Sequence, residues 1–388
     1  MRGSRIALTA AAMAIAAGLA AYGISELTSP SRGPTTGPLR LLATIALPGR
    51  PLAQFDISWV DPSSGRYYLS DVSNAGVDVI DTRTDRFVER IGGFVGGAAK
   101  THDEGGPNGV VAILELHELW VGDGDSQVRV VDTATDPARI VDTVQTGGKM
   151  RTDELAYDPD DGLILAANDA DDAAFVSIIS TRTHRLLGRL AVPEAAHGLE
   201  QSVWDGPTRS FYLAVPAVSG VGVQLQSLAA GKGLKGEILR IDPRARAITG
   251  RIATQGCINT GLAHGPGSWL LLGCFQSDVT QALDLGSGRI VRIDAVGGAD
   301  EVAYDPGRRR YYVAAAHNDA GPVLGVIDAD TDRWLQNVQT ASEAHSVAAD
   351  PASGHILVAL PPNTLAFDNN QTRGFDCRRG CVGVYGEK

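Results

Sequence analysis

The chain has 388 residues, of which 44% are hydrophobic and 20% are charged, so it can form a large core and is too apolar for a disordered protein. Its formal net charge of -11 repels a phosphate backbone and excludes nucleic acid as the expected partner. At this length, a single all-β domain is common when its strands close into a ring.

The first 38 residues have the composition of a targeting segment followed by a linker. Arg2 and Arg5 precede an apolar run at residues 6–24, the order typical of an export signal. This run is about long enough to span a bilayer, so residues 1–24 are predicted to be either a cleaved signal or an anchor. Residues 25–38 are rich in Pro, Gly, Ser and Thr and predict a flexible linker. We expect a periplasmic or extracellular protein that contacts a membrane only through an uncleaved residue 6–24 segment.

A pattern of about 40–50 residues recurs from residue 39 to the end of the chain, which is the period of propellers and solenoids. Each unit has four short β-branched and aromatic runs, joined by turn formers such as Asp-Pro-x-x-Gly and Asp-Thr-x-Thr. Four antiparallel strands make one propeller blade. Seven units are recognisable, and their first strands are predicted to start near Asp56, Asn108, Asp153, Glu200, Thr260, Asp300 and His345.

The last unit lacks an obvious fourth strand after residues 382–385, whereas residues 41–47 form a β-type run ahead of the first complete unit. The N-terminal run would complete the last blade and cover a strand edge that is otherwise open to aggregation. The sequence therefore predicts an all-β fold for residues 39–388: a seven-bladed β-propeller of four-stranded antiparallel blades, closed by an N-terminal strand.

The units resemble the YVTN-type propeller repeat. The resemblance is carried by residues 79–82 (VIDT), 130–133 (VVDT), 326–328 (VID) and 165–168 (LAAN). It implies an exported ring protein but no particular activity, because members of this family have varied roles. Two inserts, at about residues 217–235 and 361–381, depart from the repeat and are interpreted as a lid, a docking surface or decorated loops.

Four cysteines, an even number in a chain that is expected to be exported, predict disulfides. Cys257 and Cys274 belong to neighbouring strands of one predicted blade. Cys377 and Cys381 enclose only three residues. Thiolate ligation of a metal is the alternative.

The first residues of the inner strands and the loops after the second strands lie on one face of a propeller, around its channel. Two interpretations of these polar residues compete. In one, a divalent metal ion is held by carboxylate and imidazole ligands, with His102 and His317 as acid–base candidates. In the other, the same residues cap strand starts and solvate the channel mouth. The candidate metal ligands are Asp56, Asp153, Glu200, Asp300 and His345.

Three functions follow from this face. The first is a module that binds a small molecule or a protein through its His-, Asp- and Glu-rich channel mouth. The second is a metal-dependent hydrolase or lyase at the same place. The third is an electron-transfer ring with non-covalent haem, which only the unassigned histidines suggest. Whether the chain is an enzyme stays open, because fold does not imply function.

Overall fold

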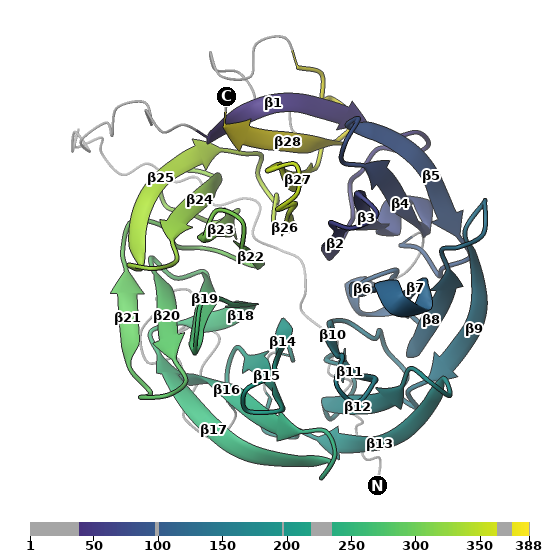
Figure 1. Cartoon of the computed structure of the whole chain (residues 1–388), viewed down its shortest axis with the longest axis vertical. Coiled ribbons are helices and arrows are strands. Elements are labelled where there is room, and N and C mark those ends of the chain that lie inside the picture. The colour runs from purple at the N-terminus through teal and green to yellow at the C-terminus, as the bar shows by residue number, and fades with distance from the viewer. Residues whose placement is uncertain (1–38, 98–100, 196–197, 219–234, 363–374, 388) are drawn as a thin grey trace, which may run out of the picture. The chain divides into compact units, whose positions relative to one another are not determined.

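A computed structural model describes residues 39–387, apart from residues 98–100, 196–197, 219–234 and 363–374. The described residues form seven four-stranded antiparallel sheets, arranged as blades around a central axis (Figure 1). This arrangement confirms the predicted fold. The predicted signal or anchor and the predicted linker lie outside the described residues, as do most of the two inserts.

The blades follow one another in chain order. Blade 1 is built from β2 (Ser58–Asp61), β3 (Arg66–Asp71), β4 (Gly76–Asp81) and β5 (Arg86–Gly92). Blade 2 is built from β6 (Val110–Ile113), β7 (Glu118–Asp123), β8 (Gln127–Asp132) and β9 (Arg139–Gln145). Blade 3 is built from β10 (Leu155–Asp158), β11 (Leu163–Asn168), β12 (Phe175–Ser180) and β13 (Arg185–Ala191). Blade 4 is built from β14 (Ser202–Asp205), β15 (Ser210–Val215), β16 (Lys235–Asp242) and β17 (Ala247–Gln255). Blade 5 is built from β18 (Ile258–His264), β19 (Trp269–Phe275), β20 (Thr280–Asp284) and β21 (Ile290–Ile293). Blade 6 is built from β22 (Val302–Asp305), β23 (Arg310–Ala315), β24 (Val323–Asp328) and β25 (Arg333–Gln339), and blade 7 from β26 (Val347–Ala349), β27 (Ile356–Leu360), β28 (Cys381–Glu387) and β1 (Leu39–Ala46). Short 3-10 helices occur at η1 (Val72–Asn74), η2 (His102–Glu104) and η3 (Leu114–Leu116).

The repeated Asp-Pro-x-x-Gly motif makes the hairpin between the first two strands of a blade. In blade 3, a carboxylate oxygen of Asp158 accepts the backbone N–H groups of Asp160 at 2.9 Å and Asp161 at 3.2 Å. In blade 6, Asp305 accepts those of Gly307 at 2.7 Å and Arg308 at 3.2 Å. The aspartate stabilises the turn by satisfying N–H groups that the strands leave free. This local role explains why the motif recurs in the sequence.

The core of the protein lies between blades. One cluster joins Leu165 and Val176 of blade 3 to Phe211 and Leu239 of blade 4, and all four side chains are fully buried. Burying each such side chain contributes about 1.5–3 kcal/mol. A single blade leaves these faces in water, so every blade depends on its neighbours.

Blade 7 joins the two ends of the described chain. β1 pairs antiparallel with β28, from Leu39 opposite Glu387 to Ala46 opposite Cys381. Leu39, Leu41 and Ile45 of β1 are buried. This pairing confirms the predicted closure by an N-terminal strand (Figure 1).

The four cysteines pair as the sequence predicts. Cys257 is bonded to Cys274, and Cys377 to Cys381. Disulfides persist in oxidising compartments, so both pairs agree with a location outside the cytoplasm. Within the described ranges, no helix has the length and apolar character needed to cross a bilayer.

Candidate functional site

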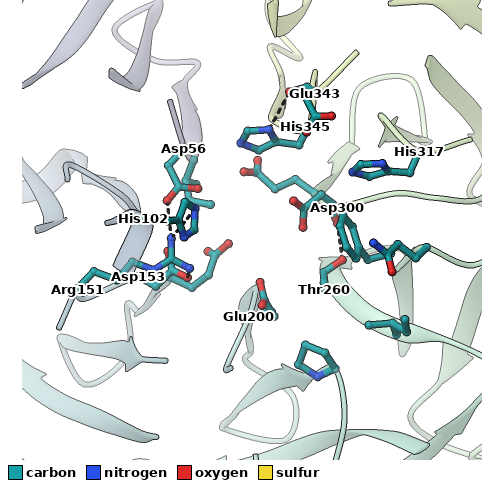
Figure 2. Close-up of a pocket in the computed structure, with 17 residues that line it drawn as sticks. Asp56, His102, Arg151, Asp153, Glu200, Thr260, Asp300, His317, Glu343 and His345 are labelled. Carbon is teal, nitrogen blue, oxygen red and sulfur yellow. Dashed lines mark hydrogen bonds and ion pairs between the residues drawn. The ribbon is translucent and has the colours of Figure 1, made fainter. Parts of the chain in front are cut away.

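A cavity of about 620 Å³ lies at the channel mouth, surrounded by the starts of the inner strands (Figure 2). A cavity of this size fits a small molecule. Its lining is strongly acidic, with one guanidinium, that of Arg151, and three imidazoles, those of His102, His317 and His345. The carboxyl groups that line it are those of Asp56, Asp153, Glu154, Glu200, Asp300, Glu301 and Glu343.

Backbone hydrogen bonds fix the acidic residues just ahead of the inner strands. The N–H of Asp153 donates to the carbonyl of Ala167 at 2.8 Å, and the N–H of Ala167 donates back to Glu154 at 2.9 Å. Asp300 and Glu301 make the same pair of bonds with Ala314 in blade 6. Each Asp-Glu pair therefore extends the ladder between the two inner strands of its blade.

Glycines in the preceding blades let these Asp-Glu segments come close. A Cβ atom at Gly109 in blade 2 would lie 2.1 Å from the carbonyl oxygen of Asp153. A Cβ atom at Gly261 in blade 5 would lie 2.2 Å from that of Asp300. Only glycine fits such an approach between backbones. A glycine of the preceding blade therefore makes room for an Asp-Glu pair at the cavity in both blade 3 and blade 6.

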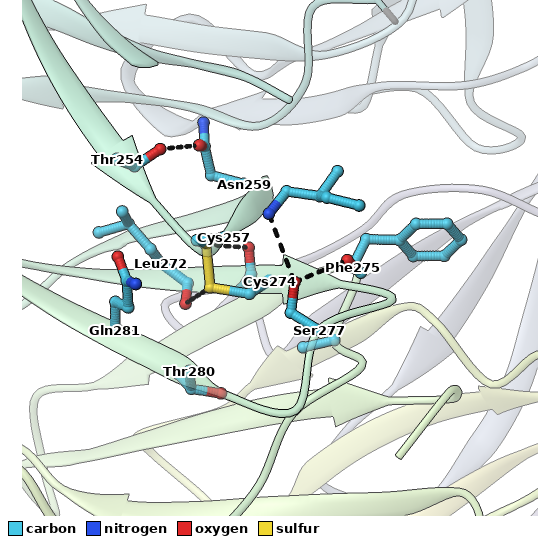
Figure 3. The surroundings of a disulfide bond; sticks show 12 residues. Thr254, Cys257, Asn259, Leu272, Cys274, Phe275, Ser277, Thr280 and Gln281 are labelled. Atoms are coloured by element: carbon cyan, nitrogen blue, oxygen red, sulfur yellow. Dashed lines mark hydrogen bonds between the residues drawn. A yellow bond between two sulfur atoms is a disulfide. The ribbon is translucent and has the colours of Figure 1, made fainter. Parts of the chain in front are cut away.

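One side of the cavity has an apolar wall. It consists of Pro216, which follows β15, Ile258 at the start of β18 and Phe275 at the end of β19. The other aliphatic lining residue, Ile57, belongs to blade 1. Cys257 and Cys274 directly precede Ile258 and Phe275, and their disulfide ties the two strands together (Figure 3). Sequence reasoning missed this wall because apolar residues in strands look like ordinary core.

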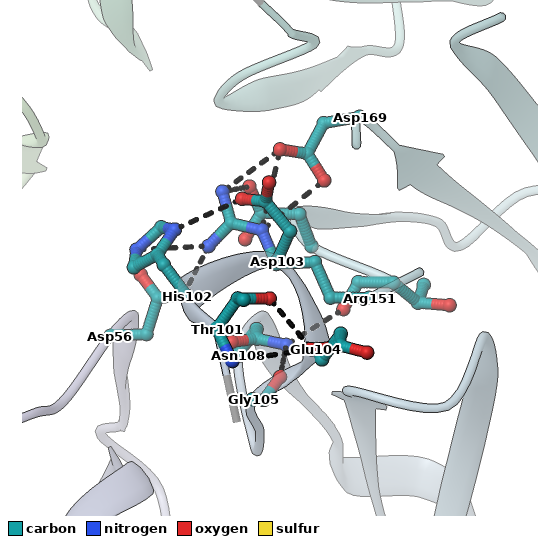
Figure 4. A network of polar contacts seen from close by, with 11 residues as sticks. Asp56, Thr101, His102, Asp103, Glu104, Gly105, Asn108, Arg151 and Asp169 are labelled. Carbon is teal, nitrogen blue, oxygen red and sulfur yellow. Dashed lines mark hydrogen bonds and ion pairs between the residues drawn. The ribbon is translucent and has the colours of Figure 1, made fainter. Parts of the chain in front are cut away.

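Arg151 neutralises the acidic groups on the side of blades 1 to 3 (Figure 4). Its guanidinium lies 2.8 Å from Asp153, 2.9 Å from Asp169 and 3.5 Å from Asp56. One Nη also lies 3.4 Å from Nε2 of His102. Arg151 is only 7% exposed, and the three carboxylates raise the pKa of its guanidinium well above the ordinary value, so it stays charged. Sequence reasoning did not assign Arg151 a role, although it directly precedes the Thr-Asp-Glu run of blade 3.

Within the described residues, no other carboxyl group of the cavity forms an ion pair with a guanidinium, although the charge of Arg151 acts at longer range on Glu154 and Glu200. Among the described residues, the Glu154 side chain makes no hydrogen bond or ion pair, although it is only 5% exposed. Glu301 accepts a hydrogen bond from Ser346 at 3.1 Å with one oxygen, and its other oxygen is buried without a partner. A buried carboxylate without a compensating cation is unfavourable. Glu154 and Glu301 therefore lack an ion-pair partner among the residues that the structure describes.

Burial raises the pKa values of this acidic group. It raises the pKa of Glu154 well above 4.5, and the nearby Asp56 and Asp300 raise it further. Burial also raises the pKa of Glu301, with Glu154 and Asp56 adding to the effect. The pKa of Glu200 is raised by burial and then by Asp300. Both causes disfavour the ionised form.

Aromatic contacts hold two of the three histidines. The imidazole of His345 stacks on Phe55 with ring centroids 4.5 Å apart, and His317 meets the ring of Phe275 edge-on at 4.7 Å. His102 belongs to η2 and is exposed. All three side chains line the cavity together with the carboxylates (Figure 2).

The structure brings together every candidate site residue that the sequence suggested. The five candidate metal ligands and the acid–base candidates His102 and His317 all line the cavity. Their assigned roles stay predictions. Within the part of the chain that the structure describes, no three His, Cys, Asp or Glu side chains are grouped as a bound metal requires. Of the predicted ring of first-strand residues, Asn108 alone does not line the cavity, because its amide donates to the carbonyls of Gly105 and Thr152.

We expect the stability of the ligand-free chain to fall as the pH rises above the ordinary carboxyl pKa values of 3.8 and 4.5. A raised pKa means that the folded chain keeps protons that the unfolded chain releases, so this contribution is largest at low pH. The groups responsible are those with raised pKa values at the cavity, namely Asp153, Glu154, Glu200, Asp300 and Glu301.

Urea unfolding at several pH values between 5 and 9 measures this dependence. A Glu154→Gln/Glu301→Gln double variant should have a flatter profile and a higher free energy of unfolding at pH 9, by about 1–3 kcal/mol. Parallel profiles for the two proteins would contradict the prediction.

The fold and the cavity together define a seven-bladed β-propeller with an acidic channel mouth. Among solved structures, hydrazine synthase from Kuenenia stuttgartiensis is similar, with a TM-score of 0.55 and 16% sequence identity over 71% of this chain and 83% of that chain. At this identity the likeness shows the fold alone. No family model matches the chain, and no curated protein matches its sequence. The resemblance to the YVTN repeat therefore stays a prediction.

Proposed function

We propose that this chain is an exported binding module whose ligand is a small cation held in the acidic cavity. The observation that carries the proposal is the Glu154 carboxylate, which is buried in the cavity wall and makes no hydrogen bond or ion pair within the described residues. A bound cation would supply the missing partner and relieve the repulsion among the neighbouring carboxylates.

Arg151 supports this interpretation by contrast. On its side of the cavity, the chain supplies its own cation to Asp56, Asp153 and Asp169. Glu154 and Glu301 line the same cavity but form no ion pair with a guanidinium or ammonium group in the described chain, although Arg151 acts on Glu154 at longer range. The space beside these two carboxyl groups is the proposed ligand position.

Isothermal titration calorimetry of the full chain at pH 8 tests the proposal. The cationic probes are methylammonium, phenethylammonium, Ca²⁺ and Zn²⁺, and phenethyl alcohol and acetate are the neutral and anionic controls. We expect at least one cation to bind with one site per chain, and the controls not to bind. Glu154→Gln should weaken this binding about tenfold or more, since it removes a charge-assisted contact of about 1.5–3 kcal/mol.

Glu237→Gln is the matched control. Glu237 of β16 is likewise a buried glutamate, but it is paired with Arg251 outside the cavity. Its substitution should leave the binding unchanged. Absence of binding by every cation at about 1 mM, the weak limit of useful affinity, would overturn the proposal.

A metal-dependent hydrolase or lyase is the second candidate, because three histidines line the same cavity as the carboxylates. Imidazole and carboxylate together suit Zn²⁺, Mn²⁺ or Fe²⁺, which activate water. In the same titrations, tight Zn²⁺ binding that is lost in both His345→Ala and Asp300→Ala would favour this candidate over an organic cation.

A further inference from the structure

The cavity is lined by both carboxyl groups and apolar side chains, and this combination bears on the kind of cation that it accepts. Carboxylates of blades 3, 4 and 6 and the apolar wall of blades 4 and 5 face the same space. Building on the function proposed above, we propose that the ligand is an organic ammonium compound with an apolar body. Its ammonium group would bind at Glu154 and Glu301, and its apolar body would lie against Pro216, Ile258 and Phe275.

The wall is built to keep its shape. Ile258 and Phe275 are directly opposite each other in the β18–β19 ladder, so their side chains lie on the same face of the blade. The disulfide between Cys257 and Cys274 crosses this ladder one position away, and both cysteines are fully buried. Ser277 adds a second link, since its hydroxyl accepts from the N–H of Ile258 at 3.5 Å and donates to the carbonyl of Phe275 at 3.2 Å (Figure 3).

The third wall residue is joined to the other two through Asn259. This buried side chain donates to the carbonyl of Val215, the residue before Pro216, at 3.0 Å. It also donates to the carbonyl of Glu237 at 3.0 Å. The wall therefore spans two blades that are fastened to each other beside the cavity, which preorganises an apolar surface for a ligand.

This combination of surfaces selects an amphipathic ligand. A metal ion or methylammonium gains nothing from an apolar wall, and a neutral apolar molecule gains nothing from Glu154 and Glu301. A ligand with both parts buries its body on Phe275, and its ammonium group satisfies the carboxylates. The aromatic face of Phe275 also attracts nearby positive charge.

The test compares methylammonium, propylammonium and phenethylammonium by calorimetry on the full oxidised chain at pH 8. We expect affinity to rise along this series, with phenethylammonium at least tenfold tighter than methylammonium. Phe275→Ala should weaken phenethylammonium about tenfold and leave methylammonium unchanged, whereas Glu154→Gln should weaken both. The series on the unmodified chain needs no variant, so a folding defect cannot obscure it.

Phe87→Ala is the matched control, because Phe87 is likewise partly exposed but belongs to the outer strand of blade 1, away from the cavity. It should leave all three affinities unchanged. Methylammonium or Ca²⁺ binding as tightly as phenethylammonium, or an unchanged phenethylammonium affinity in Phe275→Ala, would overturn the inference while leaving cation binding intact. No binding of any cation would remove the proposed function itself.

Discussion

Replacing Arg151 with methionine is expected to destabilise the chain by about 3–5 kcal/mol, because it leaves three carboxylates without their cation. Asp56, Asp153 and Asp169 surround the guanidinium, and two of them lie within 3 Å of it. The loss is a large share of the usual 5–15 kcal/mol of net stability. Urea unfolding at pH 7 measures it.

Two further variants show whether the effect comes from charge. Arg378→Met removes an exposed guanidinium that pairs with Asp376, and it should change stability little. Adding Asp169→Asn to Arg151→Met should recover part of the loss, since one of the carboxylates left without the guanidinium is then absent. If Arg151→Met unfolds like the parent chain, the network does not stabilise the ring.

Removal of residues 1–46 is expected to abolish the cooperative fold. This deletion takes away β1, with the buried side chains of Leu39, Leu41 and Ile45, and it exposes the edge of β28. The three side chains alone are worth about 5–9 kcal/mol of buried apolar surface, which approaches the whole net stability of a domain. An open strand edge also invites association between chains.

Circular dichroism during heating and analytical ultracentrifugation together measure this outcome. The deletion chain should aggregate or lack a cooperative transition. A chain that lacks only residues 1–38 keeps β1 and is the matched control, and it should unfold like the full chain. A monomeric, cooperatively folding chain without residues 1–46 would contradict the role of β1 in closure.

The fold was predictable because a propeller repeats its local chemistry. Asp158 and Asp305 make the same turn in different blades, and such positions are visible in one sequence. The first strands of the other six blades begin two residues after their predicted starts, whereas β18 begins at Ile258, two residues before Thr260. In that blade Thr260 stands where blades 1, 3, 4 and 6 have an Asp or Glu at the entry to the inner strand.

The site was predictable only where it follows the repeat. Asp153 and Asp300 occupy equivalent positions, so the ring symmetry brought them to the same cavity. Arg151 and Phe275 belong to single blades, and nothing in the repeat indicates where their side chains point. A polar residue at the end of a second strand need not reach the cavity, since Asp71 of β3 pairs with Arg90 at 2.9 Å and does not line it.

The pairing of β1 with β28 also determines when the ring can close during synthesis. Synthesis delivers residues 39–46 long before residues 381–387, and these two segments are direct partners. The loop that their pairing closes includes nearly the entire polypeptide, so the step is both late and entropically costly. A product that stops short of its last seven described residues never forms this contact. Closure of the ring thus requires that translation has passed β28, and shorter fragments are left with unpaired strands for proteases to recognise.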